Sequence, residues 1–144
     1  CGDNGAGKMP EAETLYEYIY RDTAYEKDLT GKKILVTAGP TRETIDPVRF
    51  ISNRSTGKMG FALAKNAMER GADVTLVSGP VELKDVPFVK MVHVESARQM
   101  FEAVTKEADL VKRNVIICSF ADFQWRRNIC LRIQKQSLKR KILI

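Results

Sequence analysis

KILVTAGPTRETIDPVRFISNRSTGKMG, residues 33–60, places a strand, a glycine-bearing turn and the start of a helix in direct succession. An apolar run at residues 34–36 predicts a buried strand at residues 34–37, and the turn with Gly39 follows it. A polar loop follows, and residues 55–60 open a run with helical period. Backbone N–H groups at a helix start lack intrahelical partners, and the helix dipole favours an anion there. The stretch therefore outlines a phosphate site.

The glycines of this stretch exclude two common types of phosphate-binding turn. Gly39, Gly57 and Gly60 lack a Cβ, so a ligand or a strand can approach the backbone closely. Their order is neither the Gly-x-Gly-x-x-Gly of dinucleotide-binding turns nor the lysine motif of a P-loop. Some 14 residues separate Gly39 from Asn53, and this loop is too long for either of these two phosphate-binding motifs.

The helix that begins near residue 55 has recognisable ends. Ser55 or Thr56 is expected to cap its start, and Gly71 suits the left-handed position after its last turn. Its apolar stripe is expected at four positions, and its water-facing side at three. The stripe comprises Met59, Leu63, Ala67 and Met68, and the water-facing residues are Lys65, Glu69 and Arg70.

Alternating strands and helices continue beyond this helix. Further strands are predicted at residues 73–77, 89–94 and 115–118, and Ser96 to Gln99 has the form of a capping box for a second helix. Unbroken apolar strands suit a parallel sheet that is covered on both faces. The fold class predicted is α/β, a Rossmann-like, doubly wound, mostly parallel sheet in an incomplete domain. Ligands bind such sheets beyond the carboxyl ends of the strands, where the strand order reverses. Gly39 and Ser119 converge there if the first and fourth strands are neighbours.

Composition excludes several classes of protein. Of the 144 residues, 44% are hydrophobic and 29% are charged, as in globular domains. No apolar run approaches the ~20 residues of a membrane span, and no signal peptide is visible in residues 1–30. The 3 cysteines are widely spaced, which favours neither a disulfide framework nor a zinc site and fits a reducing cytoplasm.

The net charge of +6 is concentrated at one end. Residues 1–30 hold three Lys/Arg and seven Asp/Glu, residues 31–122 hold fourteen and eleven, and residues 123–144 hold seven and none. The high pI therefore describes the last segment and says little about the central domain.

Several polar residues have two interpretations. Arg42 and Arg49 suit phosphate because a guanidinium grips two oxygens, but they could instead pair with Glu43 or Asp46. Lys58 is either an exposed helix-start lysine or a charge aimed at a triphosphate. Asn53 either shapes its loop through side-chain-to-backbone bonds or contacts substrate. His93 has no Cys, Asp or second His near it in sequence, so neither a metal site nor catalysis is expected there.

The segments TAGPTRE, DPVRFISNRS and TGKMG resemble, in order and spacing, the start of phosphopantothenoylcysteine synthetase. This family forms the second half of a bifunctional coenzyme A biosynthesis flavoprotein. The resemblance continues through Ser78-Gly79-Pro80-Val81 to about Asp122. It implies an enzyme, a phosphopantothenate–cysteine ligase, in which CTP activates the carboxylate of 4′-phosphopantothenate. Cysteine's amine then attacks the acyl-cytidylate to give an amide.

The resemblance also implies roles for individual residues. The triphosphate is expected along Gly39, Ser55, Gly57 and Gly60, with Lys58 beside it. Asn53 is expected to be catalytic and, with two further residues, to contact phosphopantothenate. CTP and Mg²⁺ are the expected co-substrate and ion, although no metal ligand can be named, and the full-length family is homo-oligomeric. The two further substrate contacts are Ala121 and Asp122.

Residues 1–11, CGDNGAGKMPE, resemble the last motif of the decarboxylase half of the same bifunctional protein. The resemblance gives Cys1 the place of the acid that protonates the decarboxylated enethiolate. The alternative is a remnant at a frayed terminus, because the flavin-binding sheet is expected upstream. The chain is therefore expected to be an inactive or incomplete fragment that binds no FMN. Residues 12–30 are predicted to form a short helix and a linker.

Residues 123–144 differ from the family pattern. They contain no acid, glycine or proline, and the family's lysine-bearing loop is expected at this point. A shift of reading frame is the favoured explanation, and a natural basic amphipathic tail is the alternative. This leaves residues 31–122 as the first half of the synthetase domain.

Two other functions remain open. One is a dinucleotide-binding Rossmann domain, although the second strand ends in Ser78-Gly79, where a ribose-binding acid is expected. The other is nucleic-acid binding through residues 123–144, in which Trp125 could stack on a base. Neither nucleic acid nor a membrane is the expected partner.

Overall fold

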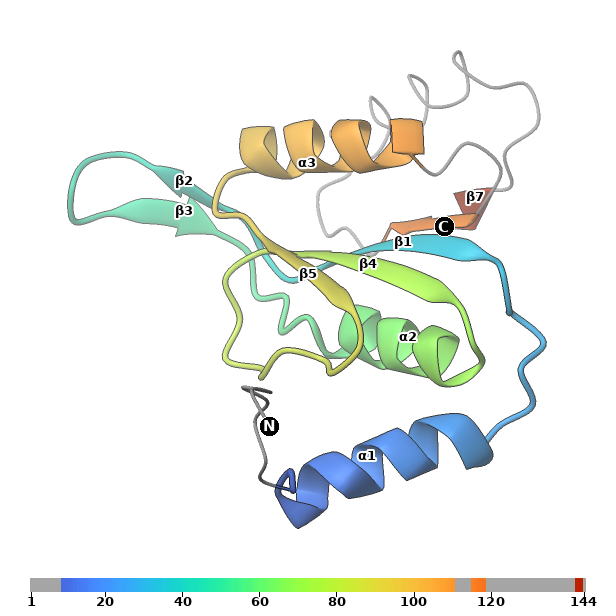
Figure 1. Cartoon of the computed structure of the whole chain (residues 1–144). Coiled ribbons are helices and arrows are strands. Elements are labelled where there is room, and N and C mark those ends of the chain that lie inside the picture. The colour runs from blue at the N-terminus through green and yellow to red at the C-terminus, as the bar shows by residue number, and fades with distance from the viewer. Residues whose placement is uncertain (1–8, 111–114, 119–141, 144) are drawn as a thin grey trace, which may run out of the picture.

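A computed structural model describes residues 9–110, 115–118 and 142–143. Its centre is a sheet of five strands with α2 (Lys58–Glu69) on one face and α3 (Ala97–Leu110) on the other (Figure 1). Every pairing in this sheet is parallel. The predicted doubly wound α/β class is confirmed. The strands are β1 (Lys33–Ala38), β4 (Asp73–Ser78), β5 (Lys90–His93), β6 (Val115–Cys118) and β7 (Ile142–Leu143).

The strand order β5-β4-β1-β6-β7 contains one reversal. The chain runs outward from β1 through β4 to β5, and it then returns to β6 on the other side of β1. Ile34 of β1 stands in register with Val74 of β4 and with Val115 of β6. The first and fourth predicted strands are therefore neighbours, which meets the condition of the sequence-based prediction, and the strand order reverses at β1.

Alternation along β1 divides the core in two. Ile34, Val36 and Ala38 pack with α2, whereas Leu35 packs with Met100 of α3. Each of these five side chains is at most 5% exposed. Both faces of the strand are thus covered by helices, which explains its unbroken apolar sequence.

The start and the buried face of α2 differ from expectation. Its N-cap is Gly57, with φ of 74° and no side-chain cap, so the prediction that Ser55 or Thr56 caps the helix was wrong. Met59 is 64% exposed and Leu63 is 37% exposed. The buried face instead comprises Gly60, Phe61, Ala64, Ala67, Met68 and Glu69.

The reason lies at Gly60. A Cβ on Gly60 would stand 2.5 Å from the Cβ of Ala38, so the helix crosses β1 at this glycine and its face is set from there. A glycine carries no weight in a hydrophobic pattern, and the predicted stripe was therefore rotated about the helix axis. The same rotation buries Glu69, which was expected to face water, to 5% exposure.

The ends of the two covering helices follow local rules. Gly71 has φ of 90°, and its N–H donates to the carbonyl of Met68 at 2.9 Å. This confirms the left-handed residue expected after α2. At α3, the N–H of Gln99 donates to Ser96 Oγ and the N–H of Ser96 donates to Gln99 Oε1, both at 3.2 Å. The predicted capping box is confirmed.

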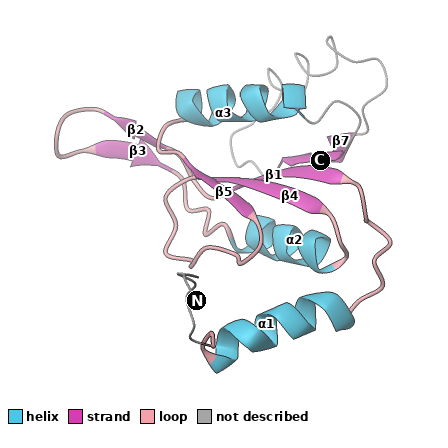
Figure 2. Cartoon of the chain, viewed as in Figure 1, coloured by secondary structure: helices cyan, strands magenta, loops and turns pink. Residues whose placement is uncertain are grey.

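The loop expected after β1 contains an antiparallel hairpin. Its strands are β2 (Arg42–Thr44) and β3 (Phe50–Ser52), and it projects away from the central sheet (Figure 2). Each strand has only three residues, too few for a reliable alternation pattern, so the sequence was interpreted as loop. The hairpin carries the chain from β1 to the segment that precedes α2.

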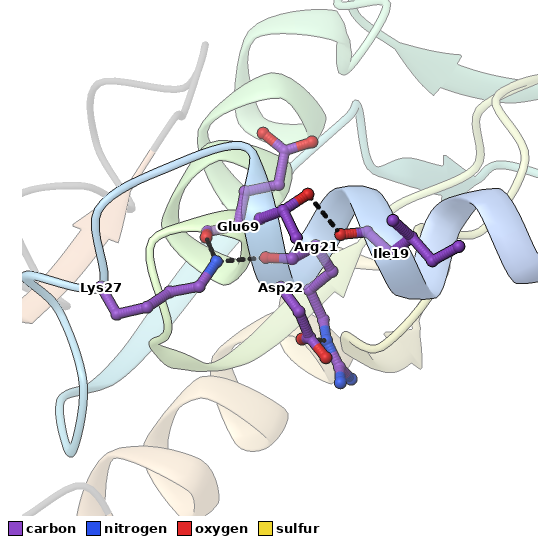
Figure 3. A network of polar contacts seen from close by, with 6 residues as sticks. Ile19, Arg21, Asp22, Lys27 and Glu69 are labelled. Atoms are coloured by element: carbon purple, nitrogen blue, oxygen red, sulfur yellow. Dashed lines mark hydrogen bonds and ion pairs between the residues drawn. The ribbon is translucent and has the colours of Figure 1, made fainter.

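The predicted short helix is α1 (Ala12–Thr23), which lies beside α2 and buries none of its own residues. Polar contacts attach the segment after α1, residues 27–28, to the end of α2. Lys27 Nζ donates to the carbonyl oxygens of Arg21 and Glu69, the latter at 2.6 Å (Figure 3). Asp28 pairs with Arg70 at the end of α2.

Among the described residues, no helix has the length and apolar character of a membrane span.

Lys90 and Glu107 give a first test of the packing. Lys90 Nζ donates to both carboxylate oxygens of Glu107 at 2.8 Å, and the Glu107 side chain is 11% exposed. Lys90→Met keeps the aliphatic stem but leaves this carboxylate without its donor. We expect a loss of about 1–3 kcal/mol in the free energy of unfolding, measured in urea. Lys106→Met, at an exposed lysine of α3, is the matched control. Equal effects of the two variants would show that the Lys90–Glu107 pair contributes no stability.

Candidate functional site

Three turns meet at the carboxyl edge of the sheet. Gly39 follows β1, Gly79 follows β4 and Gly57 precedes α2. The N–H of Gly79 donates to the carbonyl of Ala38 at 2.9 Å. A Cβ on Gly79 would lie 1.7 Å from the carbonyl oxygen of Pro40. The turns after β1 and β4 are therefore in direct backbone contact, and only glycine fits at position 79.

The chain itself fills the space beside the other glycines. A Cβ on Gly39 would lie 2.7 Å from Cγ1 of Val81, and one on Gly57 would lie 2.9 Å from the same atom. Gly39 and Gly57 also have positive φ, 79° and 74°. The sequence left open whether a ligand or the chain itself approaches these glycines. At Gly39, Gly57 and Gly60, atoms of the chain occupy the space where a Cβ would lie. The group that remains for a ligand at these turns is the start of α2, because its first N–H groups have no side-chain cap.

The segment between the hairpin and α2 holds the polar candidates. Asn53 follows β3 directly and is exposed, Ser55 is half-buried, and Lys58 is exposed at the first position of α2. Asn53 Oδ1 accepts a hydrogen bond from the N–H of Ser55 at 2.9 Å. The loop-shaping interpretation of Asn53 is therefore confirmed for its oxygen. A role of its NH₂ group toward substrate stays a prediction.

The two candidate arginines have separate surroundings. Arg49 Nε donates to Asp46 Oδ2 at 2.6 Å, so pairing within the hairpin is confirmed for Arg49. The backbone N–H of Val48 and then the Arg49 side chain lower the pKa of Asp46. Arg42 lies over the ring of Phe50, 4.7 Å from its centroid, and not against Glu43.

Arg42 and His93 line a shallow cavity of about 430 Å³ beside the turn at Gly79. His93 Nε2 stands 3.1 Å from Asp85 Oδ1, with both side chains more than half exposed. Asp85 therefore lies beside His93 in space, although the two residues are 8 positions apart in the sequence. No cluster of three metal-ligating side chains occurs among the residues that the structure describes.

A larger cavity of about 790 Å³ lies elsewhere, between α1, α2 and residues 84–88. None of the predicted site residues lines it. The carboxyl edge of the sheet thus remains the candidate site, on the general rule for doubly wound folds. Sequence reasoning missed Gly79 and Val81 as parts of this edge. The signal was present, because Ser78-Gly79-Pro80 after β4 matches Ala38-Gly39-Pro40 after β1.

Other predicted residues lie outside the described part of the chain. These are residues 1–8 with Cys1, Ser119, Ala121, Asp122 and the stretch 123–141.

The chain is similar to coenzyme A biosynthesis proteins. It is 49% identical over 138 residues to the coenzyme A biosynthesis bifunctional protein CoaBC of Mycobacterium tuberculosis, with 92% of this chain and 33% of that protein covered. The Escherichia coli protein of the same name is 45% identical over 139 residues, covering 95% and 34%. The chain thus spans about a third of the length of these relatives.

A solved structure supports the same assignment. The C-terminal domain of a CoaBC protein superposes with a TM-score of 0.62 at 53% identity, covering 65% of this chain and 47% of that one. The DNA/pantothenate metabolism flavoprotein from Streptococcus pneumoniae gives a TM-score of 0.54 at 28% identity, covering 62% and 39%.

The family model that matches covers residues 29–143, and it therefore includes most of the segment set apart as a basic tail. The division at residue 122 stays a prediction. With the parallel sheet, the glycine turns at its carboxyl edge and these similarities together, the chain belongs to the family of the DNA/pantothenate metabolism flavoprotein C-terminal domain.

Proposed function

We propose that this chain carries part of the site of a ligase in coenzyme A biosynthesis, which joins 4′-phosphopantothenate to cysteine at the expense of CTP. The observation that carries the proposal is the meeting of the turns at Gly39, Gly57 and Gly79 with the uncapped start of α2, which begins five residues after Asn53. The bifunctional coenzyme A biosynthesis relatives support it. We place the reaction in the cytoplasm, because 3 widely spaced cysteines suit a reducing compartment.

The triphosphate of CTP binds at the start of α2 in this proposal. Free N–H groups and the positive end of the helix dipole favour an anion there. The Ser55 hydroxyl can donate to a phosphate oxygen, and the Lys58 ammonium adds positive charge. Close packing of the chain at Gly39, Gly57 and Gly60 leaves little space around the start of α2. Mg²⁺ would neutralise phosphate charge and would be held mainly by phosphate oxygens, since the described residues offer no carboxylate cluster.

The reaction has two steps. The phosphopantothenate carboxylate attacks the α-phosphorus of CTP, forming the acyl-cytidylate and releasing pyrophosphate. The amine of cysteine then attacks the acyl carbon, and CMP leaves as the amide forms. Asn53 would donate a hydrogen bond from its NH₂ group to the acyl oxygen as negative charge develops there. Asp122 and Ala121 would contact phosphopantothenate, and a homo-oligomer would be the working form.

Nucleotide binding tests the proposal with the 144-residue chain itself. We expect CTP with Mg²⁺ to bind, and NAD not to bind, in calorimetric titrations. Lys58→Met should weaken CTP binding by about five- to tenfold, because a charge near the triphosphate contributes on the order of 1 kcal/mol in partly exposed surroundings. Lys106→Met on α3 is the control and should leave binding unchanged. Tighter binding of NAD than of CTP would favour the dinucleotide function, and absence of CTP binding would contradict the proposal.

A further inference from the structure

The β2–β3 hairpin has little packing of its own beneath it. Ile45 is 59% exposed, Val48 is 86% exposed and Ile51 is 64% exposed. Burial of apolar side chains therefore does not fix the angle at which the hairpin leaves the sheet. Specific hydrogen bonds at its base must hold it instead.

Two consecutive residues of β2 make those bonds. The N–H of Arg42 donates to the carbonyl of Glu95, and Glu43 Oε1 accepts from the N–H of Ala97, both at 2.7 Å. Ala97 is the first residue of α3. The hairpin is thus fastened to the turn between β5 and α3.

Glu43 supplies a bond that the capping box of α3 does not make. Gln99 Oε1 accepts from the N–H groups of Glu95 and Ser96, at 2.7 and 3.2 Å. The N–H of Ala97 is bonded to Glu43, whose negative charge also suits the positive end of the helix. Helix α3 is anchored in turn, because Met100 and Val104 are buried against the sheet at 1% exposure each.

The connection runs from Glu43 to Asn53 through the hairpin. Glu43 pairs with Ile51 and Arg42 pairs with Ser52 in the β2–β3 register. Ser52 Oγ also donates to the carbonyl of Thr41 at 2.9 Å, and Asn53 is the next residue. Any change in the angle of the hairpin therefore displaces Asn53.

We infer that Glu43 is a positioning residue for the ligation, which holds Asn53 in place by fastening the hairpin to the start of α3. This inference rests on the proposed function. Glu43 touches no substrate in this account and acts only through the hairpin. A displacement of the order of 1 Å at a reacting group can cost about 10²-fold in rate. A partial release should cost less, roughly tenfold.

Kinetics separate this role from a structural one. In a full-length bifunctional protein that carries this sequence, Glu43→Ala should lower kcat for CMP release by roughly tenfold, with KM for CTP changed by less than about twofold. Glu43→Gln retains the acceptor oxygen and should restore most of the rate. Glu102→Ala, at an exposed acid on α3, is the matched control and should leave kcat unchanged. Normal kcat in Glu43→Ala, or no rescue by Gln, would overturn the inference.

A double-mutant cycle then links Glu43 to Asn53. If Glu43 acts by placing Asn53, Glu43→Ala should have little further effect in an Asn53→Leu background. Additive effects would contradict the inference. Amide hydrogen exchange in the 144-residue chain gives an independent readout, because Glu43→Ala should accelerate exchange at Ser55, whose N–H bonds to Asn53. Should Asn53→Leu leave the rate unchanged, the proposed function loses its Asn53 role, while exchange at Ser55 still decides whether Glu43 positions the loop.

Discussion

Asn53→Leu is expected to slow amide formation by ~10²–10³, the usual cost of removing one hydrogen-bond donor from a developing oxyanion. Leucine leaves the glycine turns and the start of α2 intact, so CTP affinity should change by less than about threefold, or ~0.7 kcal/mol. The rate is measured as CMP release with phosphopantothenate and cysteine in a full-length bifunctional protein that carries this sequence. CTP affinity is measured by calorimetry.

The structure supplies the control that this substitution needs. Asn53 Oδ1 accepts from the N–H of Ser55 at 2.9 Å, so leucine removes a loop bond as well as the NH₂ donor. Asn53→Asp keeps an acceptor for Ser55 and replaces the NH₂ donor with a carboxylate oxygen, which also adds a negative charge. We expect Asp to be slow as well, since its carboxylate cannot donate to the acyl oxygen.

The outcomes separate three roles of Asn53. Slow turnover in both variants with normal CTP binding supports the donor role. Recovery of the rate in Asn53→Asp would make Asn53 a residue that shapes the loop. A large loss of CTP affinity in Asn53→Leu would move Asn53 into the nucleotide site, and near-normal turnover in that variant would remove it from the chemistry.

Gly79→Ala should cost about 3–5 kcal/mol in the free energy of unfolding, which is at the upper end for a single added methyl group. The new Cβ would lie 1.7 Å from the carbonyl oxygen of Pro40 and 2.8 Å from its carbon. Both are backbone atoms, so no side-chain rotation relieves the clash, and the turns after β1 and β4 must separate.

Gly31→Ala is the matched comparison for this variant. Gly31 has φ of 74°, but no atom lies within 4 Å of an added Cβ. Its substitution should cost only the backbone term of about 1–2 kcal/mol. Urea unfolding followed by circular dichroism measures both variants. Similar losses in the two would mean that the contact between the turns is not what requires glycine at position 79.

Local sequence was sufficient for much of the fold. The apolar run at residues 34–37, the strand at 73–77 and the Ser96–Gln99 capping box were all predicted, because each depends on residues within one or two turns of each other. The left-handed Gly71 was predicted for the same reason. The segment from Asn53 to Gly60 was recognised as a candidate site because its order of residues is specific.

Features that depend on distant residues were not predictable. Gly60 faces Ala38, so the buried face of α2 is set by a crossing that hydrophobic period does not record. The oxygen that excludes a side chain at Gly79 belongs to Pro40. The acid that accepts from the first N–H of α3 is Glu43, which lies 54 positions before Ala97. The sequence by itself determined the main strands and the helices of the parallel sheet, but not the β2–β3 hairpin or the N-cap of α2. Only the tertiary structure decided what each glycine packs against and which contacts hold Asn53, because both depend on atoms that the folded chain brings together from far apart.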